Sequence, residues 1–309
     1  MISFFHHKSN IPFIPNRRRA YLVSAVIFAV TIAALIMRGG LKLGVDFTGG
    51  TMMQIHFESP VSTDQLRRAL VEGGLTQVEI QKVRDTDHIK NAFMIRTALA
   101  GEGGESGNYA EQVKGLLGKQ FPGNRFEIDS IETVGPKIGR ELQTKAIWAV
   151  LAGCLLILAY VAVRFDFRFG VAAVVALFHD VFCTIGFIAL TNMEFNLQSV
   201  AVLLTIVGYS INDSIVVADR IRENLRKSQK ETFPELINRS INETLSRTVL
   251  TVLTVLIVLV SLQIFAGRVL ADFTKPLLFG LIVGTYSTIF IVSSLVVDWE
   301  QKSPVKRKK

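Results

Sequence analysis

The chain has 309 residues, of which 50% are hydrophobic, and its mean hydropathy is +0.39. A single soluble domain of this size rarely reaches such values, and the apolar residues here fall in long blocks, which is typical of a membrane protein. The formal net charge is +8. Most basic residues flank the apolar blocks, so this charge indicates membrane orientation rather than nucleic-acid binding.

The sequence also argues against enzymatic chemistry. The two cysteines, Cys154 and Cys183, both fall inside expected membrane spans, which leaves no disulfide framework and no CxxC metal pair. The sequence contains no HExxH, GxSxG or GxxxxGKS/T pattern, so a metalloenzyme, an intramembrane protease and a nucleotide-binding protein are poorly supported. We expect no catalytic residue, no metal and no cofactor.

Six apolar segments are long enough to cross a bilayer, which requires about 20 residues. An even number of spans puts both chain ends on the same side. Eighteen of the 34 basic residues fall on that side, whereas the two short loops on the other side hold only two. Because cytoplasmic loops carry the excess of Lys and Arg, we predict that both termini are cytoplasmic. The expected spans are 20–37, 146–163, 169–190, 195–217, 248–267 and 276–297.

The remaining segments complete the predicted domain organisation. Residues 1–19 and the basic tail 299–309 form cytoplasmic ends, and residues 145–298 contain a five-helix membrane bundle. Residues 38–144, between the first two spans, are predicted to form an extracytoplasmic α+β domain.

Hydrophobic patterning predicts six elements in this outer domain. The order β-α-β-β-α-β is that of a ferredoxin-like domain. Ser62 or Thr63 is expected to cap the first helix, which buries Leu66, Ala69 and Leu70. A mobile Gly- and Glu-rich connection is expected over Gly101–Asn108. The elements are a strand within Val45–Phe57, the capped helix, strands over Thr76–Val83 and Asn91–Thr97, a helix over Tyr109–Gln120, and a strand over Arg125–Val134.

Two glycine-containing segments stand out. Asp46–Gly50 reads DFTGG, and its paired glycines indicate a turn that acts as a hinge between membrane and domain. In the sixth span, Gly280 and Gly284 are four residues apart and are followed by Thr285, Ser287 and Thr288. Small residues allow helices to approach closely in lipid, so we interpret this segment as bundle packing.

The segment Gly208–Asn224 reads GYSINDSIVVADRIREN and places an acid inside the fourth span. Asp213 precedes Arg220 by seven residues, which is about 10 Å along a helix. Charged residues within membrane helices are costly, tend to face the bundle interior and are functional candidates. Burial disfavours the ionised form of a carboxylate and a nearby cation favours it, so an acid here can exchange a proton.

Several residues are candidates to assist Asp213. Arg247 begins the fifth span at the same end of the membrane and is the candidate counter-charge; an interface anchor is the alternative. His179 and Asp180 lie roughly 18 Å along a helix from Arg168, near mid-bilayer, and serve either a secondary relay or polar packing. Tyr209 and Ser210 share the helical face of Asp213 and are expected to hydrogen-bond to it, and Asn212 adjoins it.

The sequence Val45–Gly50, the stretch Val134–Gly139 (VGPKIG) and Gly208–Asn224 together resemble SecF, the family of subunits of the bacterial SecDF protein-translocation complex, in the resistance-nodulation-division superfamily. The resemblance covers essentially the whole chain. It implies a proton-driven auxiliary of the SecYEG channel that draws a preprotein across after the SecA ATPase has driven it in. It also implies that SecD supplies the other half of a twelve-helix unit, that the chain lies in the bacterial inner membrane, and that Asp213 and Arg247 form the proton relay.

The implied partners are therefore SecD, SecYEG, the translocating preprotein, other Sec accessory subunits and the lipid bilayer, with no nucleic acid. Two alternatives remain open at this point. A proton-coupled small-molecule exporter of the same superfamily is expected to carry twelve spans in one chain. A purely structural translocon subunit predicts that Asp213 and Arg247 are replaceable.

Overall fold

Long apolar helices account for most of the chain, as the sequence predicts. The computed structural model describes residues 10–75, 78–83, 91–97, 106–227, 231–265 and 270–303. Contacts divide the chain into two units, one formed by residues 1–42 and 148–309 and the other by residues 43–147. Six helical segments are long and apolar enough to cross a membrane. The prediction of six membrane spans and a small sheet is thus confirmed.

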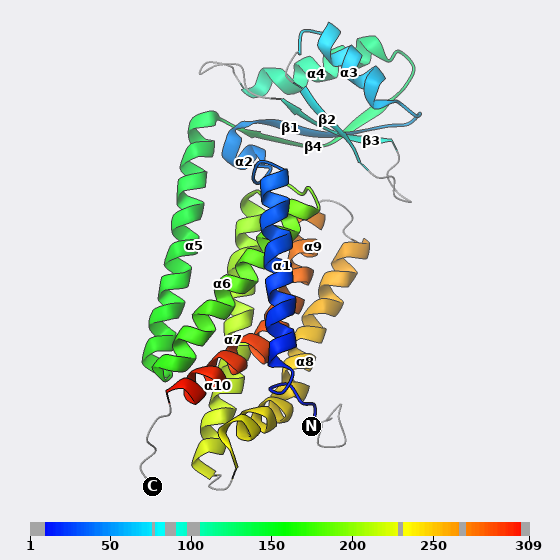
Figure 1. Ribbon diagram of the computed structural model, residues 1–309. Helices are drawn as coiled ribbons and strands as arrows, with labels where there is room; N and C mark the ends of the chain where they lie inside the picture. The colour runs from blue at the N-terminus through cyan, green and yellow to red at the C-terminus, as the bar shows by residue number, and fades with distance from the viewer. Residues whose placement is uncertain are drawn as a thin grey trace. The chain divides into compact units, whose positions relative to one another are not determined.

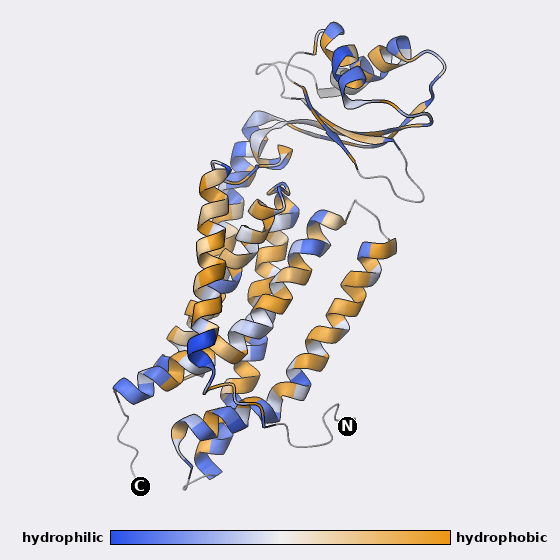
Figure 2. Cartoon of the chain, turned by 45° about the vertical axis from the view of Figure 1, so that its right-hand side comes forward, coloured by the Kyte–Doolittle hydropathy of each residue, from blue (hydrophilic) through white to orange (hydrophobic). Residues whose placement is uncertain are grey.

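The helices extend beyond the apolar segments from which they were predicted. Helical backbone hydrogen bonds do not require apolar side chains, so a helix can continue into the charged residues that flank an apolar segment. Figure 2 shows hydrophilic residues at several helix ends. The last span is one continuous helical segment of three parts, with a π-helical stretch in the middle. The spans are α1 (Arg17–Met37), α5 (Pro136–Arg164), α6 (Phe167–Leu190), α7 (Leu197–Lys227), α8 (Phe233–Phe265), and α9 (Ala271–Ser287) with η1 (Thr288–Val292) and α10 (Ser293–Lys302).

Three of the spans form the interior of the membrane unit. More than half of the span window is buried in α6, in α7 and in the α9–η1–α10 segment, compared with 17% in α1 and α8 and 6% in α5. The helix α1 packs on α6, while α8 packs on α7 and α9. Any polar side chain at the junction of α6, α7 and α9 is therefore shielded within the protein itself.

The smaller unit contains a four-stranded antiparallel sheet with strand order β2-β3-β1-β4. The helices α3 and α4 pack together and contact the sheet (Figure 1). Its core contains Ile55, Phe57, Leu66 and Phe93, each at most 1% exposed. The elements are α2 (Val45–Thr48), β1 (Gly50–Phe57), α3 (Thr63–Glu72), β2 (Val78–Lys82), β3 (Ala92–Thr97), α4 (Ser106–Gln120) and β4 (Phe126–Val134).

Local sequence signals in this unit correspond closely to the structure. Ser62 caps α3 in a capping box: its hydroxyl accepts from the Gln65 backbone N–H, and the Gln65 side chain accepts from the Ser62 backbone N–H. The buried residues of α3 are Leu66, Ala69 and Leu70, as predicted. Most of the connection expected over Gly101–Asn108 lies outside the described residues, although α4 already begins at Ser106.

The DFTGG segment forms one helical turn, α2, followed by two glycines with φ of +74° and +136°. A Cβ on Gly49 would lie 2.7 Å from the Pro136 Cα, and a Cβ on Gly139 would lie 3.0 Å from the Phe47 carbonyl oxygen. These glycines therefore permit backbone-to-backbone packing between the turn and the first residues of α5. Two segments about 90 residues apart in the sequence meet here.

Candidate functional site

Asp213 is buried in the middle of α7, with 6% of its surface exposed. Its neighbours on α7 include Ser210, and across the interface lie Gly280 and Gly284 of α9. Together these residues line a cavity of about 10 Å³, roughly the room that one water molecule requires. The carboxyl group thus adjoins a small cavity whose lining combines a few polar side chains with aliphatic residues and glycine.

Arg247 lies on α8 with an exposed side chain, and its charge is close enough to act on Asp213. The two residues, both in the described part of the chain, do not form a direct ion pair. The arrangement therefore supplies a positive field at Asp213 without a fixed hydrogen bond. Such a carboxylate can bind or release a proton without first breaking an ion pair.

Asp180 is the most completely buried acid of the membrane unit, with 0% exposure. Its Oδ2 accepts hydrogen bonds from the hydroxyls of Ser210 on α7, at 2.6 Å, and Ser287 on α9, at 2.7 Å. Its Oδ1 lies 3.0 Å from Nδ1 of His179, and Nε2 of His179 lies 3.6 Å from Sγ of Cys183. One carboxylate therefore connects α6, α7 and α9.

The structure differs from the prediction for the neighbours of Asp213. Ser210 donates to Asp180 rather than to Asp213, because its side chain is directed across the helix interface toward α6. Asn212 is exposed on the outer face of α7, whereas Tyr209, although 37% exposed, lines the same small cavity as Asp213. Sharing a helical face with Asp213 did not determine the partner of Ser210, since an acid on another helix lies closer.

The α9 residues contribute more to this junction than the sequence indicated. A Cβ on Gly280 would lie 2.0 Å from Cδ1 of Ile206, so glycine is needed for α9 to approach α7. Directly after Ser287 the helix widens into η1, and Thr288, its first residue, lies 3.1 Å from the Ser214 hydroxyl. Short π-helical stretches often occur at functional sites. In the sequence, Ser287 and Thr288 follow Gly280 and Gly284, and these hydroxyl residues could have indicated a polar junction. From the sequence alone, the segment is interpreted only as helix packing.

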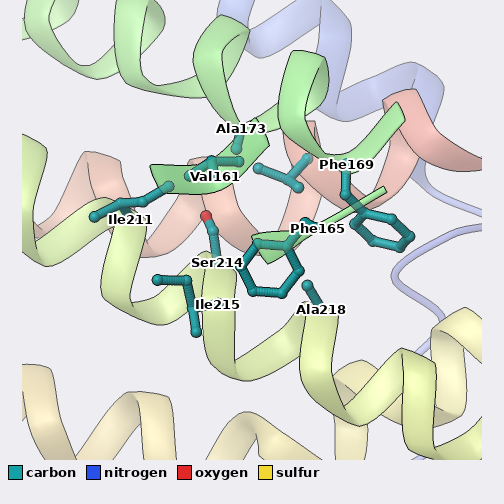
Figure 3. Close-up of a pocket in the computed structure, with 9 residues that line it drawn as sticks. Val161, Phe165, Phe169, Ala173, Ile211, Ser214, Ile215 and Ala218 are labelled. Atoms are coloured by element: carbon teal, nitrogen blue, oxygen red, sulfur yellow. The ribbon is translucent and has the colours of Figure 1, made fainter. Parts of the chain in front are cut away.

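A second small cavity adjoins this junction and is almost wholly apolar. Figure 3 shows the Ser214 hydroxyl among hydrophobic side chains, including Phe169 of α6, Ile211 of α7 and Phe165, which lies between α5 and α6. The cavity offers about 10 Å³. It has too few polar groups to orient a small-molecule ligand.

The charged residues at the end of α7 form ion pairs at the protein surface. Asp219 pairs with Arg164 at 3.1 Å, and both side chains are more than 40% exposed. Arg220 pairs with Glu243 on α8 at 2.7 Å, and the buried Asn224 donates to the same carboxylate at 2.8 Å. The contacts of Arg220 and Asn224 with Glu243 hold α7 to α8, whereas the pair of Asp219 and Arg164 joins α7 to α5. Among the described residues, no group of three or more His, Cys, Asp or Glu side chains is arranged to hold a metal ion.

Fold and site together define a multi-pass membrane protein with buried acids at the centre of a helix bundle and a separate α+β unit. Residues 115–302 match the family described as "Protein export membrane protein SecD/SecF, C-terminal", and residues 35–61 match the "SecD/SecF GG Motif". The first match covers more than half of the chain. The chain therefore belongs to the SecD/SecF family of protein export membrane proteins.

Its relatives include separate SecF subunits and fused SecDF proteins. The chain is 40% identical to protein translocase subunit SecF of Endomicrobium trichonymphae over 97% of its own length and 94% of that protein. It is 41% identical to SecDF of Thermus thermophilus, of which it covers 38%. The crystal structure of SecDF from Thermus thermophilus, a translocon-associated membrane protein, matches with a TM-score of 0.83, covering 95% of this chain and 39% of that one.

Proposed function

We propose that this chain is a SecF-type subunit that, together with SecD, uses the proton-motive force to promote preprotein translocation through the SecYEG channel. The observation that carries the proposal is Asp213, an acid buried in a membrane helix, near the Arg247 charge and beside a small cavity. Protonation of such an acid changes the charge between packed helices and so biases their arrangement. Moving one charge through the membrane field yields about 2.3 kcal/mol per 100 mV.

The proposed topology follows from the charge distribution and the family. Both termini face the cytoplasm, the membrane is the bacterial inner membrane, and residues 38–144 form an extracytoplasmic domain. The element order β-α-β-β-α-β and the strand order β2-β3-β1-β4 support a ferredoxin-like fold for this domain. The matches to SecDF, in which both halves occupy one chain, support SecD as the partner.

Asp213→Asn tests the proposal in proteoliposomes that contain the chain with SecD, SecYEG and SecA. The measurement is the rate at which a preprotein already driven in by SecA completes its passage into the vesicles, with and without an imposed proton gradient. We expect Asp213→Asn to abolish the stimulation by the gradient, because the amide cannot take up a proton. Asp219→Asn is the matched control: it changes an acid on the same helix that is exposed and ion-paired, and we expect it to retain the stimulation.

Full stimulation by the gradient in Asp213→Asn contradicts the proposal. If Asp213→Asn also retains normal complex assembly and export, the chain is a structural subunit. Gradient-driven efflux of a hydrophobic dye in the absence of preprotein would instead indicate a small-molecule exporter.

A further inference from the structure

The proposed function uses Asp213 but gives no role to Asp180, which is more deeply buried. Asp180 lies where α6, α7 and α9 meet, and two hydroxyls and one imidazole contact its carboxylate. Placing an acid here is costly, because an isolated carboxylate loses its hydration in a medium of low dielectric constant. A neutral aliphatic side chain would pack without that cost. The acid therefore requires an explanation beyond packing.

The hydrogen-bond partners of Asp180 share one chemical property. The hydroxyls of Ser210 and Ser287 can each donate or accept, and the imidazole of His179 can do either, depending on which nitrogen carries the proton. In the described part of the chain, no lysine or arginine forms an ion pair with Asp180. A guanidinium only donates, so it would favour the ionised acid permanently. With hydroxyl and imidazole partners, the network can persist whether Asp180 is ionised or protonated.

Other titratable groups face this cluster from the packed helices. On α6, Cys183 lies beside His179, and on α9 the ring of Tyr286 lies 6.2 Å from that of His179. On α7 the nearest acid in sequence is Asp213. Among the described residues named here, none carries a fixed positive charge.

Ser210 connects the two acids of the site. It precedes Asp213 by three residues on α7, so both side chains lie on neighbouring positions of one helical face. It donates to Asp180 and also lines the cavity that Asp213 lines. This cavity has about the room that one water molecule requires, and both side chains line it. Gly280 and Gly284 border the same space.

We propose that Asp180 is a second proton-exchanging residue, connected to Asp213 through Ser210 and one water molecule. The O–H bond of protonated Asp213 breaks as its proton passes to the water, the water gives a proton to Ser210 Oγ, and Ser210 gives its own hydroxyl proton to Asp180 Oδ2. Asp213 becomes ionised and Asp180 neutral, while the water and Ser210 are restored. This inference rests on the proposed proton-coupled function and extends it into the bundle interior.

Ser210 and Ser287 allow a matched test, because each donates one hydrogen bond to the same oxygen of Asp180 but only Ser210 lines the Asp213 cavity. The chain is reconstituted with SecD in vesicles that contain a pH-sensitive dye, and proton uptake is driven by an imposed gradient. We expect Ser210→Ala to lower uptake about tenfold or more, because a transferring hydroxyl is lost. We expect Ser287→Ala to lower it less than about threefold. Ser214→Ala, which removes a buried hydroxyl one turn further along α7, should leave uptake unchanged.

Infrared difference spectra between acidic and alkaline pH supply the second measurement. Asp180→Asn should remove a protonated-carboxyl band that persists in Asp213→Asn. Equal losses of uptake in Ser210→Ala and Ser287→Ala would show that both serines only support packing, and this overturns the inference. Absence of a carboxyl band assigned to Asp180, or full uptake in Asp180→Asn, overturns it as well. If the expected effects at Ser210 and Asp180 are not observed but Asp213 remains essential for proton uptake, the proposed function stands and Asp180 has no part in it.

Discussion

Two carboxylates of the membrane unit lie in opposite surroundings. Asp180 is fully buried and is bound by serine hydroxyls, whereas Glu243 is partly exposed and is bound by the guanidinium groups of Arg220 and Arg239, at 2.7 and 2.9 Å. The hydroxyls can follow a change in protonation, but the guanidinium groups cannot. The two sites thus differ in the chemistry of their donors. The first arrangement suits proton exchange and the second suits holding two helices together.

The space around the Asp180 junction is the feature that we expect to be most sensitive to substitution. In Gly280→Val the new side chain would collide with the buried Ile206, since a Cβ alone would lie 2.0 Å from its Cδ1. We expect a loss of about 3 kcal/mol in stability from overpacking, measured as a lower midpoint of thermal unfolding in detergent. Gly208→Ala is the control, because a Cβ at Gly208 meets no atom within 4 Å. Equal stability of the two variants would show that α9 does not need this close approach.

Removing the buried acid should have the next largest effect. Asp180→Leu keeps a similar size but leaves the hydroxyls of Ser210 and Ser287 without their acceptor, and we expect a loss of about 2 kcal/mol in the free energy of unfolding. Replacing both serines by alanine in the same variant should restore most of this loss, since no stranded hydroxyl then remains. A triple variant no more stable than Asp180→Leu would indicate that the carboxylate itself, rather than its hydrogen bonds, stabilises the junction.

The ion pair between α7 and α8 should contribute least. Arg220→Gln removes a pair in which the two side chains are 36% and 29% exposed. We expect a loss below about 1 kcal/mol, because solvent screens exposed charges, and a smaller loss at high salt. A double-mutant cycle with Glu243→Gln measures the coupling directly. A coupling energy well above about 1 kcal/mol that does not change with salt would contradict this expectation and show that the pair is shielded from solvent.

Much of the fold could be predicted from local sequence. The six spans follow from runs of apolar residues, and the start of α3 follows from Ser62 and Gln65, three residues apart. Burial of Asp213 was also expected, because it lies within an apolar segment. Each of these features depends on residues close in sequence, where hydropathy and hydrogen-bonding capacity act over one or two helical turns.

The partners inside the bundle could not be predicted in this way. The sequence suggested that Ser210 serves Asp213, whereas the structure directs it to Asp180, and Ser287 joins them from a helix about 100 residues away. The π-helical stretch that begins at Thr288 likewise has no sequence signal that we recognised.

Local sequence therefore specifies the helical segments, the order of the strands and the burial of Asp213. The helix faces that meet, and the acid to which each hydroxyl donates, depend on how the helices pack. The physical reason is that the rotation and separation of packed helices depend on contacts between residues distant in sequence, such as Gly280 against Ile206. Those contacts select one arrangement among several that the same local patterns allow.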